Sequence, residues 1–101
     1  MKPMDLKERT LIFTVSIMNF VEGLPDTRAI RIVSDQILRS SSSVGANYRA
    51  ARRSKSPRDF INKLKIVEEE SDETLYWLQL LRRSNIGEPE ILDKLIREAR
   101  T

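Results

Sequence analysis

The sequence contains neither cysteine nor histidine. Without cysteine, disulfide bonds and thiolate metal sites are excluded. Without histidine, Ser-His and Cys-His catalysis is excluded too, and zinc or di-iron chemistry is disfavoured. These absences argue against a hydrolase and against a metalloenzyme. We therefore expect a protein with no enzymatic activity, no cofactor and no metal.

Long apolar runs are also missing. No stretch of about 18 apolar residues occurs, so the sequence predicts no transmembrane helix and no membrane partner. The first ten residues, MKPMDLKERT, lack the apolar core of a signal peptide. We expect a cytoplasmic protein.

Strand signals are absent as well. Apolar and polar residues never alternate over a sustained stretch, and no Asn-Gly or Asp-Gly hairpin occurs. A composition of 40% hydrophobic and 33% charged residues is typical of a folded, helix-rich protein. The 101 residues correspond to one domain, residues 1–101. A chain this short buries only a modest core, which favours oligomerisation.

Helix caps and apolar spacing predict four helices. The first covers about residues 5–22 and ends at Gly-Leu-Pro. The second begins near Asp26 or Thr27, both good N-caps. Its three-then-four apolar spacing starts at Ile30 and continues through four consecutive serines to Asn47 and Ala51. Because the period survives the serines, this stretch is predicted to be helical.

The third helix has the clearest start signal. Ser56 is a good N-cap, Pro57 suits the first helical position, and Asp59 favours a helix start. This helix reaches about Arg83, and a fourth covers about residues 89–99. Four helices with short connections predict an all-α, antiparallel up-and-down four-helix bundle.

Two helices carry a second apolar face. The main stripe of the first helix contains Leu6, Phe13, Ile17, Phe20 and Leu24, and the seam of the third contains Phe60, Leu64, Val67, Ser71, Thr74, Leu78 and Leu81. The additional faces consist of Leu11, Val15 and Met18 on the first helix and Ile66, Trp77 and Leu80 on the third. A single four-helix core offers these six side chains no obvious partner. We expect them to form the interface of a homo-oligomer.

The serine–glycine segment suits close helix packing better than phosphate binding. A phosphate-binding loop needs a Gly-rich turn after a strand and a lysine in register, and this segment has neither. Small residues let two helix backbones approach closely. The packing residues predicted here are Ser43, Gly45, Ala46 and Asn47. Asn47 falls on the apolar seam, where a buried asparagine usually fixes register.

Charge is concentrated in residues 39–58, which hold six basic residues and no acidic one. These candidate nucleic-acid-binding residues are Arg39, Arg49, Arg52, Arg53, Lys55 and Arg58. They could contact a phosphate backbone. They could equally be a solvated helix end, where cations suit the helix dipole, or they could pair with the acidic run at residues 68–73 of the third helix. The residues alone leave all three interpretations open.

The motif Ser43-Val44-Gly45-Ala46-Asn47, the basic turn after it, and the helix that opens with Phe60 and continues through Glu68 and Glu73 form a combined signature. With LPDTR at the end of the first helix and QILRSSSSVGAN in the second, the sequence resembles the four-helix-bundle family encoded in intervening sequences of bacterial 23S rRNA genes. The resemblance covers nearly the whole chain. It implies a bundle that assembles into a ring, commonly a pentamer, with no known enzymatic activity. Relatives serve as accessory proteins of diversity-generating retroelements, where a basic ring is thought to engage nucleic acid and a reverse transcriptase.

Two functional hypotheses follow. The first is a non-enzymatic homo-oligomer that binds nucleic acid, with RNA favoured, through the basic end of the second helix and the turn after it. The alternative is an interaction scaffold without nucleic-acid binding. In that case the basic segment pairs with the acidic helix of a neighbouring subunit, and the ring docks a protein partner.

Overall fold

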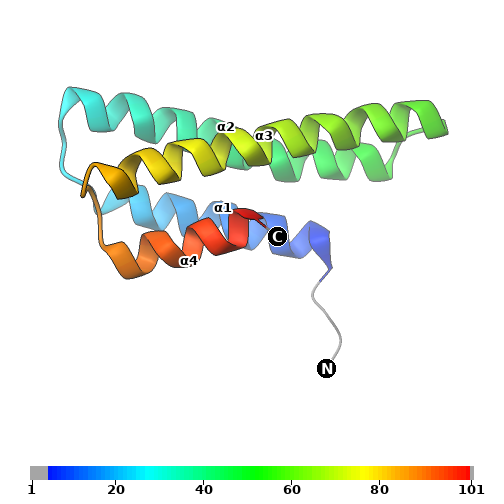
Figure 1. The fold of residues 1–101 in the computed structure, drawn as a ribbon. Helices are drawn as coiled ribbons and strands as arrows, with labels where there is room; N and C mark the ends of the chain where they lie inside the picture. Colours follow the sequence, from blue (N-terminus) through cyan, green and yellow to red (C-terminus); the bar gives the residue numbers. More distant parts are fainter. Residues whose placement is uncertain (1–4, 101) are drawn as a thin grey trace.

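Residues 5–100, the part of the chain that the computed structural model describes, form four α-helices (Figure 1). Their bounds are α1 (Leu6–Glu22), α2 (Arg28–Arg52), α3 (Pro57–Arg83) and α4 (Pro89–Arg100). Each predicted boundary is confirmed to within about two residues. No strand occurs in the described range, so the all-α prediction is confirmed.

The helix starts are set by side-chain caps. Thr27 Oγ1 accepts a hydrogen bond from the Ile30 amide at 3.3 Å, and Ser56 Oγ accepts one from the Asp59 amide at 3.1 Å. Asp5 caps α1 by accepting from the Lys7 amide at 3.2 Å. Each cap satisfies an amide that has no partner inside its own helix.

The four helices pack in a closed ring in which each contacts its neighbours in chain order, and α4 returns to contact α1. The predicted up-and-down four-helix bundle is confirmed. The helices differ in length, however, and α2 and α3 are much longer than α1 and α4. They form a hairpin whose closed end extends past the start of α1 and the end of α4 (Figure 1).

The hydrophobic core lies at the opposite end of the bundle from this hairpin turn. Its buried residues are Ile17, Phe20, Ile37, Leu78, Leu81, Leu92 and Leu95. The loop between α3 and α4 covers this end, with Ile86 packed against the core. Toward the hairpin turn the predicted apolar stripes lose their cover, so that Leu6 of α1 and Phe60 of α3 are exposed. This exposure differs from the prediction, which placed both residues on core-facing stripes.

Small side chains line the contacts that α2 makes. Ser40, Ser41 and Thr74 are completely buried. The Thr74 hydroxyl of α3 lies 2.8 Å from Ser40 Oγ and hydrogen-bonds to it. On the other side of α2, Thr14 Oγ1 of α1 donates to the Ser41 carbonyl at 3.1 Å. A Cβ atom added to Gly45 would lie 3.3 Å from Thr10 Oγ1, so Gly45 marks the close approach of α1.

The other predicted packing residues, Ser43, Ala46 and Asn47, are half-buried or exposed. Asn47 is half-buried, and its Nδ2 donates to the carbonyl and the hydroxyl of Ser43 in its own helix, at 2.9 and 2.8 Å. Ala46 is exposed. The interhelical polar contact that can set the α2–α3 register is therefore the Ser40–Thr74 pair, and the register role expected of Asn47 is not seen.

We expect the Ser40–Thr74 hydrogen bond to be measurable in a double-mutant cycle. Thr74→Val keeps the side-chain shape but removes the hydroxyl, so it should cost about 1 kcal/mol of unfolding free energy in urea titrations. The double variant Thr74→Val with Ser40→Ala should lose less stability than the sum of the two single variants, because the Ser40 hydroxyl that Thr74→Val leaves without its partner is removed as well. Ser42→Ala, at an exposed serine of the same helix, is the control. Strict additivity would show that the pair contributes nothing.

Candidate nucleic-acid interface

The projecting end of the α2–α3 hairpin is strongly basic. We define the hairpin tip as residues 49–65, which include the end of α2, the loop and the start of α3. It holds seven basic residues and one acidic residue, Asp59. The basic residues are Arg49, Arg52, Arg53, Lys55, Arg58, Lys63 and Lys65.

Most of the predicted basic cluster remains available to a ligand. Arg49, Arg53, Lys55 and Arg58 are exposed and form no ion pair with any residue between 5 and 100. Arg52 Nη1 lies 3.3 Å from Asp5 Oδ2, which joins the start of α1 to the end of α2. Both side chains of this ion pair are exposed, so the pair contributes little to the stability of the fold. The structure thus brings five of the six predicted residues to one end of the molecule.

Arg39 is separated from the other five. It lies ten residues before Arg49, or about 15 Å along α2. It forms ion pairs with Glu70, at 3.2 Å, and with Glu73, both on α3. Arg39 therefore belongs to an ion-pair network between the helices rather than to the tip. Pairing between the basic segment and the acidic run, one of the predicted alternatives, does occur for Arg39, but within a single chain.

Glu73 is the centre of this network. Its carboxylate accepts a hydrogen bond from Trp77 Nε1 at 3.1 Å and another from Arg39. These two donors, Trp77 first, hold the pKa of Glu73 below its ordinary value. A carboxylate with a lowered pKa in the folded state stabilises the fold above its unfolded-state pKa. That contribution is lost as the pH falls through the folded-state value.

We predict an acid-sensitive part of the stability that depends on Glu73. The contribution should be fully present above the ordinary pKa of 4.5 and should decrease below it. The free energy of unfolding in urea is measured at neutral pH and at about pH 3. The fluorescence of Trp77, the sole tryptophan, follows unfolding next to Glu73. Glu73→Gln should reduce the difference between the two pH values. Glu69→Gln is the control, because exposed Glu69 makes no ion pair within residues 5–100. An equal pH difference in wild type and Glu73→Gln would contradict the assignment.

The predicted oligomer residues fall on two surfaces. Leu11, Val15 and Met18 are 46, 49 and 52% exposed along the outer side of α1. Ile66 and Leu80 are exposed on α3, whereas Trp77 is half-buried and packs against the core. Its ring meets exposed Tyr76 edge-on, with centroids 5.0 Å apart. The stripe on α1 is thus the largest apolar surface among the predicted interface residues.

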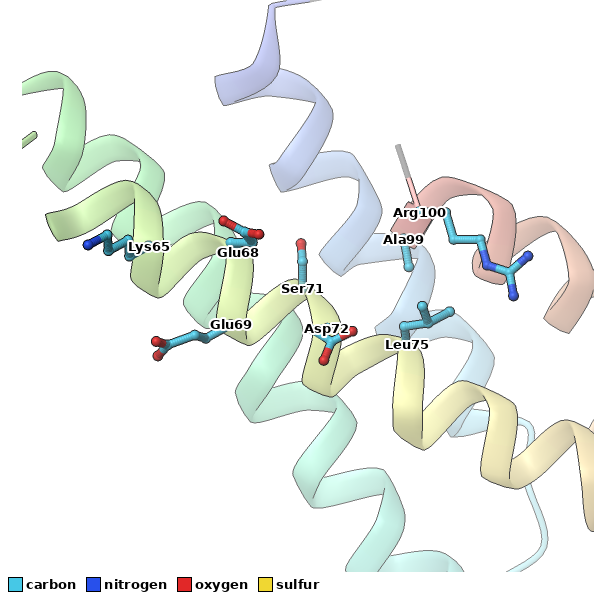
Figure 2. Close-up of a pocket in the computed structure, with 8 residues that line it drawn as sticks. All are labelled: Lys65, Glu68, Glu69, Ser71, Asp72, Leu75, Ala99 and Arg100. Atoms are coloured by element: carbon cyan, nitrogen blue, oxygen red, sulfur yellow. The ribbon is translucent and has the colours of Figure 1, made fainter. Parts of the chain in front are cut away.

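Glu68, Glu69 and Asp72 of the acidic run line an open hollow where α4 ends and α3 continues (Figure 2). Its polar lining includes Lys65, Glu68, Ser71 and Asp72 of α3, with Arg100 at the end of α4. Figure 2 shows Glu68, Glu69 and Asp72 pointing in different directions around α3. Within residues 5–100 no three potential ligands converge to hold a metal ion. The acidic residues therefore form a charged helix surface.

An apolar groove between α1 and α4 includes Ile12, which the sequence did not single out. Ile12 and Ile91 are exposed there, beside Phe13 and Leu95. Ile12 falls between the two predicted stripes of α1, so the periodicity gave no signal for it. In the described part of the chain, no helix has the length and hydrophobicity of a membrane span.

Fold and charge together define a small four-helix bundle with an extended, basic helical hairpin. The family model described as 23S rRNA-intervening sequence protein matches residues 2–101. The chain therefore belongs to that family, and the predicted resemblance is confirmed.

A solved structure supports this assignment. It is the crystal structure of a protein of unknown function from the S23 ribosomal protein family of Bacteroides thetaiotaomicron VPI-5482. The two are 38% identical with a TM-score of 0.87, over 95% of this chain and 89% of the other. The comparison with curated proteins found no match.

Proposed function

We propose that the protein is a non-enzymatic homo-oligomer that binds nucleic acid through the hairpin tip. The observation that carries this proposal is the collection of seven basic residues against one acidic residue at the projecting end of the bundle. Six of the seven basic side chains, all except Arg52, have no ion-pair partner in the described range, so a phosphate backbone would not have to displace one there. Each neutralised phosphate releases condensed counterions, which favours binding.

RNA is the favoured ligand in this proposal, and duplex DNA is the comparison that tests the choice. The tip offers mainly cations, which position a nucleic acid without reading its sequence. We therefore expect binding that tolerates changes of sequence. The test is the affinity for structured RNA and for duplex DNA across a salt series. The logarithm of the binding constant should fall steeply and linearly with the logarithm of the salt concentration. An affinity that does not depend on salt concentration, or the absence of binding at low salt, would contradict the proposal.

The exposed apolar stripe on α1 supports assembly into a homo-oligomer. Leu11, Val15 and Met18 lie along one side of α1 and are about half exposed in the described part of the chain. We propose a ring, and five subunits as the resemblance implies. A ring would repeat the hairpin tip and gain avidity for a long nucleic acid without new contacts.

We expect Val15→Glu to dissociate this oligomer, because it places a charge in the middle of an apolar interface. Light scattering at micromolar concentration measures the mass of the particle. Ser16→Glu, at an exposed polar position on another side of the same helix, should leave the mass unchanged. A wild-type protein that is already a monomer would refute the interface.

A second candidate function is a protein-interaction scaffold. Arg39 pairs with Glu70 and Glu73, which shows that the two charged segments fit each other chemically. In the scaffold, the tip would pair with exposed acids on α3 of a neighbouring subunit, and the assembly would dock another protein, such as a reverse transcriptase. Arg53→Glu then distinguishes the two: it breaks the assembly in the scaffold, and it weakens only nucleic-acid binding in the leading proposal.

A further inference from the structure

Phe60 is exposed at a position where the sequence pattern predicts a buried residue. It lies on the apolar seam of α3, in the first turn, yet 41% of its surface is accessible. The Ser40–Thr74 contact sets the antiparallel register of α2 and α3. Continued along the hairpin, this register places Phe60 opposite Ser54, which lies past the end of α2 at Arg52. The last residues of α2, Ala51 and Arg52, lie beside the ring but leave part of it exposed.

A hollow of about 450 Å³ lies at this point of the hairpin tip. Phe60 and Pro57 contribute apolar surface to its lining, and Arg52 and Lys55 contribute positive charge. No lining residue is a carboxylate, but Arg52 is paired with exposed Asp5 outside the hollow, so a phosphate at Arg52 would compete with Asp5. A ligand that fits must therefore combine negative charge with an apolar face.

An unpaired nucleotide has this combination. A phosphate ion would leave the aromatic ring unused, and a duplex keeps the faces of its bases stacked inside. A single strand exposes both its phosphates and the faces of its bases, which stack on aromatic side chains. Anionic lipid also combines negative charge with apolar surface, so phosphatidylserine vesicles serve as a competing probe.

We propose that this hollow binds an unpaired nucleotide of a single-stranded RNA, with the base stacked on Phe60 and the neighbouring phosphates near Arg52 and Lys55. The proposal rests on the proposed function and deepens it by naming the form of nucleic acid. The serine hydroxyls of the loop are partly engaged: Ser54 donates to the Ala51 carbonyl, and Ser56 accepts from the Asp59 amide, which leaves each with only part of its hydrogen-bonding capacity. With few groups left to read a base edge, the hollow accepts any base.

The test uses the full chain and a short single-stranded RNA that carries one 2-aminopurine, with a duplex of the same sequence as the second probe. Stacking on Phe60 should change the fluorescence of the 2-aminopurine. Phe60→Ala should weaken single-strand binding roughly 5-fold or more and leave duplex binding unchanged. Phe60→Tyr keeps the ring and should restore the affinity. Ile61→Ala is the matched control, because Ile61 is the next residue, is 53% exposed and does not line the hollow.

The outcomes separate this proposal from the proposed function. If the wild type binds neither probe, both fail. If it binds both with a steep salt dependence and Phe60→Ala changes neither affinity, the nucleotide site fails and the basic interface stands. Equal losses on both probes would also overturn the site. So would dissociation of the oligomer by Phe60→Ala, or Phe60-dependent binding to phosphatidylserine vesicles without a preference for single strands.

Discussion

Replacing Arg49, Arg53, Lys55 and Arg58 together with glutamine should weaken RNA binding by about 100- to 1,000-fold near physiological salt. Each lost phosphate contact removes the counterion release that accompanied it, so the slope of log affinity against log salt should become shallower by about 3. The four side chains are exposed and carry no ion pair in the described range, so the fold should survive. Arg52 is left in place because it pairs with Asp5 at the start of α1.

The control must remove the same charge from elsewhere on the molecule. Four exposed basic residues outside the tip suit this purpose: Arg28, Arg83, Lys94 and Arg97. Changing them to glutamine alters the net charge equally, so any long-range effect of total charge should be the same in both variants. Only the tip variant should lose the phosphate contacts. Equal losses in the two variants would mean that binding follows net charge, and the tip would not be an interface.

The largest effect on stability is expected from Gly87→Ala. Gly87 has φ +89°, a conformation that side chains rarely adopt. A Cβ atom there would lie 2.7 Å from Cζ of Phe20 and 3.2 Å from Cδ2 of Leu24. Backbone strain and overpacking together should cost about 2–4 kcal/mol. The melting temperature, measured by circular dichroism, should fall by more than about 10 °C.

Gly23 provides the matched control for this substitution. It follows α1 with φ −88°, in the right-handed helical region, and an added Cβ would meet only the Phe20 carbonyl at an ordinary 3.6 Å. Gly23→Ala should therefore change the melting temperature little. If the two alanine variants were equally stable, the tight fit of the α3–α4 loop over Phe20 would be disproved.

The helix boundaries could be predicted because local chemistry determines them. Thr27 and Ser56 satisfy amides a few residues away, and such contacts are visible in a short window of sequence. Of the two buried serines of α2, Ser40 could also be placed, because the apolar period runs through it to Val44, whereas Ser41 lies off that period. Periodicity does not show where a neighbouring helix stops, however. For that reason Phe60 was expected to be covered.

The candidate interface was predicted in part. A charge count along the chain located the basic segment. It gave no indication that Arg39 pairs with Glu70 and Glu73 across the hairpin. Nor did it add Lys63 and Lys65, because both follow Asp59, beyond the end of the segment 39–58 that has no acidic residue. Both differences arise because antiparallel pairing brings together residues that are distant in the sequence.

The uneven placement of the core has a consequence for local motion. The end that contains Ile17, Leu78 and Leu92 is fully packed, whereas the hairpin tip has few buried side chains beyond Ala51. Amide hydrogens at the tip should therefore exchange with solvent through small openings, and those near Leu78 only through global unfolding. We therefore expect the packed end, which we call the anchor, to open rarely and the hairpin tip to open often. A ligand held at the tip would slow exchange there first and would leave the anchor unchanged.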